Sequence, residues 1–306
     1  MAINQQAMSI ANNVRNTFIR LPQVVRVLDR AEQLIQTDWS GLEPDPLVIL
    51  GDTGVGKSTL LLHLLRKYPR VEHETFSEIP LLYLEVPARS TIPRLCGEML
   101  RVIGLPFQIA GDDGETALIT LIKACKIKLV VLDELNHLVE RGRSRTHYNV
   151  GDWVKQISHK AGASFLLSGT PAAGKLLTTN EQLGDRFAEV IHMRPLAGEA
   201  LRAALKVFQT NLKGIDCVDF SSPAASKALG LATEGRLRAI RRLLIRAVEI
   251  GLKRSTPKID MDVLAQAFLE VIYPDAPDAR SPFAPKFDGR RLSKSGEPFA
   301  PREVLE

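Results

Sequence analysis

A glycine-rich octapeptide that ends in a lysine and a serine is the clearest chemical signal in the sequence. Residues 51–58 read Gly-Asp-Thr-Gly-Val-Gly-Lys-Ser and match the pattern G-x-x-x-x-G-K-[ST]. In such a loop, backbone N–H groups point inward around phosphates, the lysine reaches the β- and γ-phosphates, and the serine hydroxyl holds Mg²⁺. A plain glycine turn between a strand and a helix does not need the Lys57–Ser58 pair.

The context of this octapeptide supports a phosphate-binding loop. An apolar run, Leu47–Leu50, precedes it, and a leucine-rich helix over residues 58–68 follows. The guanine-reading motif N-K-x-D is absent, so ATP is favoured over GTP as the ligand. The expected cofactors are ATP and Mg²⁺, with Ser58 as a metal ligand. The predicted nucleotide-binding residues in the loop are Gly51, Asp52, Thr53, Gly54, Val55, Gly56, Lys57, Ser58 and Thr59.

Two adjacent carboxylates follow a second apolar strand. Residues 129–132 read Leu-Val-Val-Leu and lead into Asp133 and Glu134. Asp133 is expected to hold Mg²⁺, and Glu134 to act as the general base that polarises an attacking water. Paired acids also occur at ordinary strand-ending turns, but the phosphate-binding loop upstream favours catalysis. The sequence therefore predicts an ATPase that forms ADP and phosphate, with Lys57 and Glu134 as catalytic residues.

Three further positions are candidates for completing the site. A hydroxyl after the apolar strand 165–168 could orient the water, with Thr170 preferred over Ser168; a hydroxyl-rich strand end is the plainer interpretation. Arg186 could be an arginine finger that reaches a neighbouring subunit's γ-phosphate, or an ordinary surface arginine. Arg238, with Arg236 as its alternative, could reach back to the nucleotide. The basic helix that they open could otherwise be a solvated or DNA-facing surface.

The order of elements indicates how these residues are positioned. Apolar strands alternate with helices up to residue 193, which predicts an α/β fold with a parallel sheet flanked by helices. Only helices are expected after Pro195, and they form a small lid. Six prolines among the last 33 residues predict an extended, flexible tail. The expected domains are an N-terminal segment with a helix (1–40), a nucleotide-binding core (41–195), a helical lid (196–273) and the tail (274–306).

Composition narrows the class of protein without naming an activity. A net charge of +5 over 306 residues permits a polyanionic partner but does not demand one. The three cysteines are far apart in the sequence and predict neither a disulfide framework nor a metal site. No apolar run reaches 18 residues and no leader is visible, so we expect a cytoplasmic protein that does not span a membrane.

Taken in order, the two nucleotide motifs, the hydroxyl strand end, Arg186 and the helical lid resemble an AAA+ P-loop ATPase. Flanking segments narrow the resemblance to the TniB/TnsC family of transposition regulators, which is related to MuB. These segments are Thr-Phe-Ile-Arg-Leu-Pro (17–22), Ile-Pro-Arg-Leu (92–95) with Ile-Gly-Leu-Pro (103–106), Leu-Asp-Glu-Leu-Asn-His-Leu (132–138) and Ser-Gly-Thr-Pro (168–171). The resemblance extends over residues 18–272.

The resemblance implies a function and a set of partners. Members of the family assemble on double-stranded DNA in an ATP-dependent way, as a ring or helical filament. They choose or mark the target and recruit or activate a DDE transposase. The expected protein partners are therefore a transposase of the TniA or TnsB type, a TniQ-type adaptor and further copies of this chain.

The resemblance also places DNA contacts on the core around the second motif. The candidates are Arg89, Arg94, Arg101, Thr120 and Lys123, and the loop residues Arg141, Arg143 and Arg145. Such basic groups would contact phosphates, so binding should be largely independent of DNA sequence; a solvated loop is the alternative. Two other functions stay open: a nucleotide switch that acts through protein partners, and a clamp- or helicase-loader-type ATPase. The basic loop favours DNA binding over the first of these.

Overall fold

The structure is a computed structural model of the chain. It describes residues 2–39, 42–88, 90–105, 112–139, 144–174, 189–254 and 256–300. The chain divides into two compact units. The first comprises residues 1–21, 54–56 and 194–306, and the second comprises residues 22–53 and 57–193. The predicted segment 1–40 is therefore shared between the two units, because the division falls between Leu21 and Pro22.

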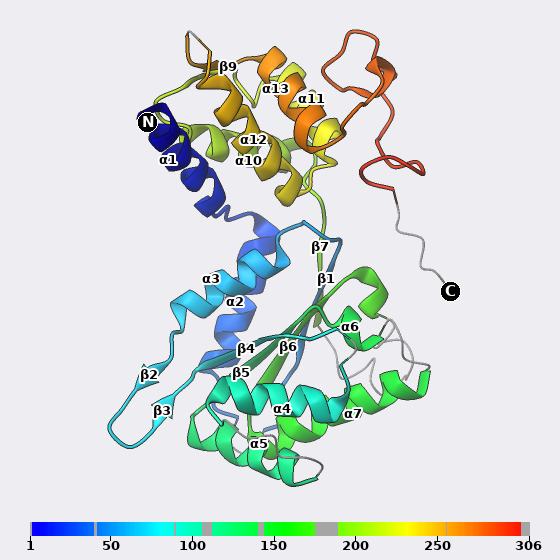
Figure 1. The fold of residues 1–306 in the computed structure, drawn as a ribbon. Helices are drawn as coiled ribbons and strands as arrows, with labels where there is room; N and C mark the ends of the chain where they lie inside the picture. Colours follow the sequence, from blue (N-terminus) through cyan, green and yellow to red (C-terminus); the bar gives the residue numbers. More distant parts are fainter. Residues whose placement is uncertain are drawn as a thin grey trace. The chain divides into compact units, whose positions relative to one another are not determined.

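A five-stranded parallel sheet forms the centre of the second unit (Figure 1). Its strands are β1 (Leu47–Gly51), β4 (Leu81–Glu85), β5 (Leu129–Asp133), β6 (Ser164–Gly169) and β7 (Glu189–Met193). The strand order is β4-β5-β6-β1-β7. Every residue of β1, β5 and β6 is buried, as expected for parallel strands that are covered on both faces. Strand β6 thus separates β1 from β5.

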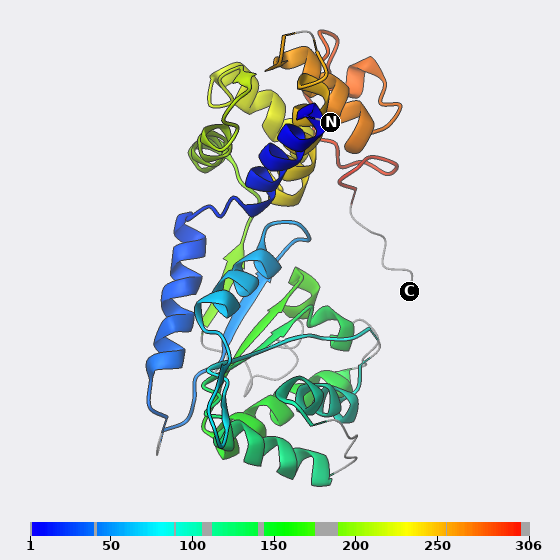
Figure 2. The ribbon, with the colours of Figure 1, turned by 60° about the vertical axis from the view of Figure 1, so that its left-hand side comes forward.

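Helices cover both faces of this sheet (Figures 1 and 2). They are α2 (Pro22–Gln36), α3 (Lys57–Lys67), α4 (Ile92–Ile103), α5 (Asp112–Ala124), α6 (Asn136–Val139) and α7 (Ser144–Ala161). Helices α4, α5 and α7 share a core with alternate strand residues such as Val130 and Phe165. A 3-10 turn, η1 (Pro171–Gly174), follows β6, and a short antiparallel pair, β2 (Val71–Glu72) and β3 (Ser77–Glu78), follows α3.

The first unit consists mainly of helices. They are α1 (Ala2–Asn16), α10 (Gly198–Thr210), α11 (Pro223–Thr233), α12 (Leu237–Gly251) and α13 (Met261–Val271). Between them, β8 (Asp216–Cys217) pairs in parallel with β9 (Lys258–Ile259). The sequence predicted only helices in this part of the chain, so the prediction missed this short strand pair. Helix α1 packs on α12. No helix among the described residues is both long and apolar enough to cross a membrane.

Residues 274–300 pack against the rest of the first unit, and the prediction of an extended tail does not agree with these contacts. Arg280 is only 8% exposed, and its guanidinium donates to Glu297 (2.8 Å). The buried Leu292 donates its N–H to the Glu234 carboxylate (3.1 Å). Charged and backbone hydrogen bonds, together with aromatic contacts and one buried leucine, hold this segment. Its low aliphatic content was therefore a poor guide to whether it would fold.

Candidate nucleotide-binding site

The phosphate-binding loop links the end of β1 to the start of α3. Gly54 and Gly56 have φ angles of +87° and +109°, a backbone region that favours glycine. Lys57 is the first residue of α3 and is only 6% exposed. Its Nζ donates to the backbone carbonyls of Gly51 (2.5 Å) and Asp52 (3.2 Å). A buried ammonium at a helix N-terminus provides the positive environment that phosphates require.

The second motif lies where β5 ends. Asp133 is the last residue of this strand and is 1% exposed. Its Oδ1 accepts the backbone N–H of Glu134 (2.9 Å), and its Oδ2 accepts the hydroxyl of Tyr83 (3.2 Å). Glu134 has a φ of +56°, so the chain turns sharply out of the strand at this residue. Asp133 is therefore buried, whereas the neighbouring Glu134 is half-buried. This difference suits the predicted roles, in which Asp133 holds Mg²⁺ and Glu134 polarises a water.

Tyr83 is a site residue that the sequence analysis missed. It lies on β4, the strand next to β5 in the sheet. Burial, together with the negative charge of Asp133 and their hydrogen bond, raises the pKa of Tyr83 well above its usual value. The phenol therefore remains protonated and acts as a hydrogen-bond donor to the Asp133 carboxylate. A tyrosine in an apolar strand has no sequence signal that links it to a residue so far along the chain.

The end of β6 lies beside both motifs. Ser168 is aligned with Ile49 of β1, and its carbonyl accepts the N–H of Leu135, which follows the second motif (2.9 Å). A β-carbon on Gly169 would approach that of Ala173 to 2.7 Å, so this position needs a glycine. Because the carboxyl ends of parallel strands β1, β5 and β6 meet at one edge of the sheet, the predicted catalytic residues other than Arg186 are brought to that edge.

Two buried polar atoms at this edge have no hydrogen-bond partner among the described residues. They are Oγ of Ser168, which is fully buried, and Oδ1 of Asn136, which is 6% exposed. Thr170 is half-buried beyond the strand, and its carbonyl accepts the N–H of Ala173 (2.9 Å). Buried polar groups that lack a protein partner commonly bind a ligand or water. This observation adds Asn136 to the candidate residues and keeps Ser168 beside Thr170.

The donor set fits Mg²⁺ bound together with a nucleotide. Ser58 is in the first turn of α3, and Asp133 provides carboxylate oxygens. No group of three or more histidines, cysteines or carboxylates suited to a metal occurs in the described part of the chain. Mg²⁺ is commonly held by only one or two protein oxygens, with phosphates and waters supplying the remaining ligands. The two residues are consistent with that chemistry.

The start of α12 carries the two arginines predicted near the nucleotide. Within the first unit, the backbone N–H of Arg238 donates to the carbonyl of Gly54 (3.0 Å). The Arg236 guanidinium lies 5.3 Å from the ring centre of Phe299. Gly235, just before them, has a φ of +65°, and a β-carbon there would clash with the carbonyl of Leu196 at 1.9 Å. Glycine is thus required at the turn that leads into α12.

Several basic side chains of α12 are engaged within the first unit. Arg241 donates to the Thr17 carbonyl (2.7 Å), Arg242 to the Val271 carbonyl (2.6 Å) and Arg246 to Glu249 (2.6 Å). Burial lowers the pKa of Arg241. These contacts give much of the basic helix a structural role. They weaken the interpretation of its whole length as a DNA-facing surface.

Some predicted residues fall outside the described part of the chain. Arg186, Arg89, Arg141 and Arg143 are among them, and Arg145 lies in α7 without a described side chain. Of the other DNA-binding candidates, Arg94 and Arg101 are exposed on α4, and Thr120 and Lys123 are exposed on the neighbouring α5. Arg101 pairs with Glu98 (2.8 Å). Their roles, and that of Arg186, stay predictions.

A family model described as Bacterial TniB protein matches residues 9–195. The chain belongs to the TniB family. The match covers the predicted core and both nucleotide motifs, and it agrees with the resemblance of the flanking segments. No curated protein matches this TniB-family chain.

Solved structures show the same fold at low sequence identity. Cdc6p from Pyrobaculum aerophilum matches with a TM-score of 0.63 and 15% identity, over 87% of this chain and 72% of that one. The Aeropyrum pernix ORC1 protein, solved in complex with DNA, matches with a TM-score of 0.61 and 18% identity, over 83% of this chain and 66% of that one. The Thermotoga maritima RuvB Holliday junction branch migration motor matches with a TM-score of 0.51 and 17% identity, over 83% and 70%.

These similarities establish the architecture of the chain. The predicted α/β fold, an AAA+ P-loop core with a parallel sheet flanked by helices, is confirmed. The chain spans 66% of the length of the ORC1 protein and 72% of Cdc6p. At identities this low, the similarity concerns the fold alone.

Proposed function

We propose that this TniB-family protein binds and hydrolyses ATP and uses the nucleotide to assemble on double-stranded DNA as a regulator of transposition. One observation carries the proposal: within the TniB match, the ammonium of the buried Lys57 contacts the last residue of β1, and the Asp133–Glu134 pair lies at the carboxyl end of β5 in the same parallel sheet. The phosphate-binding loop and a positioned carboxylate pair are the parts that phosphoryl transfer to water requires.

The residues of the site have separate tasks in this proposal. Loop N–H groups and the Lys57 ammonium bind the phosphates, and the ammonium exchanges its contacts with the Gly51 and Asp52 carbonyls for phosphate oxygens. Bound Mg²⁺ would neutralise charge on the phosphates, held by Ser58 and Asp133. Glu134 polarises the water that attacks the γ-phosphate, while the bond to the β–γ bridging oxygen breaks. Ser168 or Thr170 orients this water.

DNA binding is proposed to depend on assembly of several subunits. A single subunit offers few basic contacts, and such contacts are sensitive to salt. Subunits joined side by side, in a ring or filament, would bring the exposed Arg94 and Lys123 and the arginines of residues 141–145 to the phosphates of one duplex at high effective concentration. Arg186 of one subunit would complete the nucleotide site of the next. The assembled form would then recruit or activate a DDE transposase, with a TniQ-type adaptor as a further partner.

The test is DNA affinity measured against salt concentration with a slowly hydrolysed ATP analogue, with ADP and without nucleotide. We expect the protein to bind DNA tightly only in the presence of the ATP analogue. In that state, electron micrographs should show ordered rings or filaments on duplex DNA. The Lys57→Ala variant should lose both nucleotide binding and the ATP-dependent DNA binding. Equal DNA affinity in all three states would reject the ATP dependence. Bare DNA in every state would favour a switch that acts through protein partners.

A further inference from the structure

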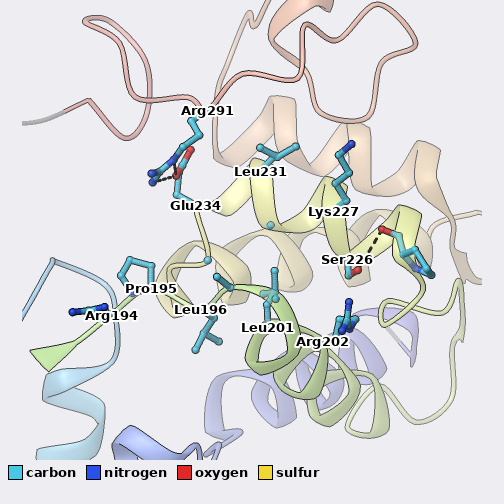
Figure 3. Close-up of a pocket in the computed structure, with 15 residues that line it drawn as sticks. Arg194, Pro195, Leu196, Leu201, Arg202, Ser226, Lys227, Leu231, Glu234 and Arg291 are labelled. Carbon is cyan, nitrogen blue, oxygen red and sulfur yellow. Dashed lines mark hydrogen bonds and ion pairs between the residues drawn. The ribbon is translucent and has the colours of Figure 1, made fainter.

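A groove with a volume of about 650 Å³ lies on the first unit, apart from the phosphate-binding loop (Figure 3). Its walls come from residues 194–198, from α10 and α11, and from Arg291. We call it the lid groove. Its volume falls within the range of about 300–1,000 Å³ that is typical of ligand sites. All of its lining residues belong to the first unit, so its shape can be considered without the second unit.

The floor of the lid groove is apolar. Leu196 and Leu201 are 5% and 6% exposed, and the half-buried Leu231 also lines the groove, from α11. Gly198 leaves the backbone bare at one edge, since no heavy atom lies within 4 Å of the position of an added β-carbon. The floor can therefore accept an aliphatic side chain, whose burial would remove apolar surface from water.

The rim of the lid groove is basic. Four of its five charged lining residues are cationic: Arg194, Arg202, Lys227 and Arg291, against Glu234. The Glu234 carboxylate is already occupied, because it accepts from Arg291 and from the backbone N–H of Leu292. Arg202 and Lys227 are exposed, and neither has an ion-pair partner among the described residues. Figure 3 shows these two side chains on one side of the leucines.

The combination of floor and rim selects the kind of ligand. A nucleic acid backbone would satisfy the cations but would leave the apolar floor of the groove without a partner. A purely apolar ligand would leave the cations without a role in recognition. A peptide with aliphatic side chains at its centre and acidic side chains on either side complements both, because apolar anchors fill the centre of such interfaces and charged pairs form at the rim.

We propose that the lid groove is a docking site for an acidic peptide segment of a partner protein. An aliphatic side chain of this segment lies among Leu196, Leu201 and Leu231, and its carboxylates pair with Arg202 and Lys227. The groove contains none of the residues that bind phosphates or Mg²⁺ in the proposed function. Docking therefore needs no bound nucleotide, and its failure would not affect the nucleotide site.

The test uses the full chain and the fluorescein-labelled peptide Gly-Asp-Glu-Leu-Leu-Glu-Asp-Gly in fluorescence anisotropy titrations. We expect saturable binding with and without ATP. Changing both leucines of the peptide to serine, or its four acids to lysine, should weaken binding by at least about tenfold. The variant Arg202→Glu with Lys227→Glu should also weaken it by at least about tenfold.

Lys206→Glu is the matched control, because Lys206 is also exposed on α10 but does not line the groove. This variant should bind the peptide within about twofold of the unchanged protein. Unaltered circular dichroism and ATP binding would show that each variant is folded.

Three outcomes would overturn the proposal. The first is the absence of saturable binding of the acidic leucine peptide. The second is equal binding of the serine peptide, which would mean charge attraction alone. The third is that the variant Arg202→Glu with Lys227→Glu loses more affinity for duplex DNA than for the peptide. This result would assign the groove to nucleic acid.

Discussion

The hydroxyl of Tyr83 donates to Oδ2 of Asp133 across the neighbouring strands β4 and β5, at 3.2 Å. The backbone N–H of Glu134 holds the other oxygen of the same carboxylate. Each oxygen of Asp133 thus accepts one hydrogen bond, which fixes the orientation of a buried anion. Partners of this kind orient metal-binding carboxylates and tune their affinity.

We expect Tyr83→Phe to impair the use of Mg²⁺ by the protein. The change keeps the ring in its strand but removes the donor to Asp133, so the carboxylate loses one constraint. The Mg²⁺ concentration for half-maximal ATPase activity, and that for half-maximal binding of an ATP analogue, should rise on the order of tenfold. Tyr68→Phe is the control, because it removes a hydroxyl away from Asp133. Identical Mg²⁺ curves for Tyr83→Phe and the unchanged protein would refute this role.

Glu134→Gln should separate nucleotide binding from hydrolysis. The substitution removes the general base but keeps Asp133 and the phosphate-binding loop. Turnover should fall by about 10²–10⁴-fold while ATP affinity stays close to that of the unchanged protein. Single-turnover hydrolysis and equilibrium binding measure the two quantities. Lys57→Ala is the contrasting variant, since it should abolish binding itself. Undiminished turnover in Glu134→Gln would exclude Glu134 as the base.

Arg280→Ala should destabilise the first unit. The guanidinium of Arg280 is almost buried and contacts Asp288, Glu297 and the carbonyl of Arg291. Without this side chain, the carboxylates and the carbonyl lose a hydrogen-bond donor. The free energy of unfolding should therefore fall by about 1–3 kcal/mol. Urea unfolding followed by circular dichroism measures this change. Lys286→Ala, an exposed change in the same segment, should shift the midpoint little. Equal midpoints for both variants would mean that the ion pairs contribute nothing.

The same cluster predicts a loss of stability in acid. Burial opposes ionisation of Glu297, but hydrogen bonds from Arg290, the Lys294 N–H and Arg280 lower its pKa to about 2. The unfolded chain has a glutamate pKa of about 4.3, so the stabilisation is fully present above that pH and is lost as the pH falls toward 2. Urea midpoints measured from pH 5 to pH 2.5 should therefore fall more steeply in the unchanged protein than in Glu297→Gln. Parallel curves would contradict the assignment.

The nucleotide motifs could be predicted from the sequence because their chemistry fixes residue types at fixed spacing. Gly54, Gly56 and Lys57 form one continuous loop, and the buried strand before Asp133 has a continuous apolar signal. The parallel sheet follows from the same signals, since its strands alternate with amphipathic helices such as α4.

Other features depend on contacts between distant positions. Helix α1 buries only a narrow face, including Ile10 and Val14, so its asparagine-rich sequence gave little indication of a helix. Tyr83 acquires its role from the sheet register, which no local pattern encodes. Arg280 and Glu297 meet only because the intervening residues fold back. In the sequence, a segment held by ion pairs has the same charged composition as a solvated segment, so the two are hard to distinguish.

The connection of residues 274–300 to Glu234 has a mechanical consequence. Tension applied at the carboxyl end of this segment would be carried first by the contacts of Glu297 with Arg280 and Arg290, and then by those of Arg291 and Leu292 with Glu234. Glu234 directly precedes Gly235, at the turn before α12. A pull on the segment would therefore load this turn through side chains, by a route shorter than the covalent path back through α13.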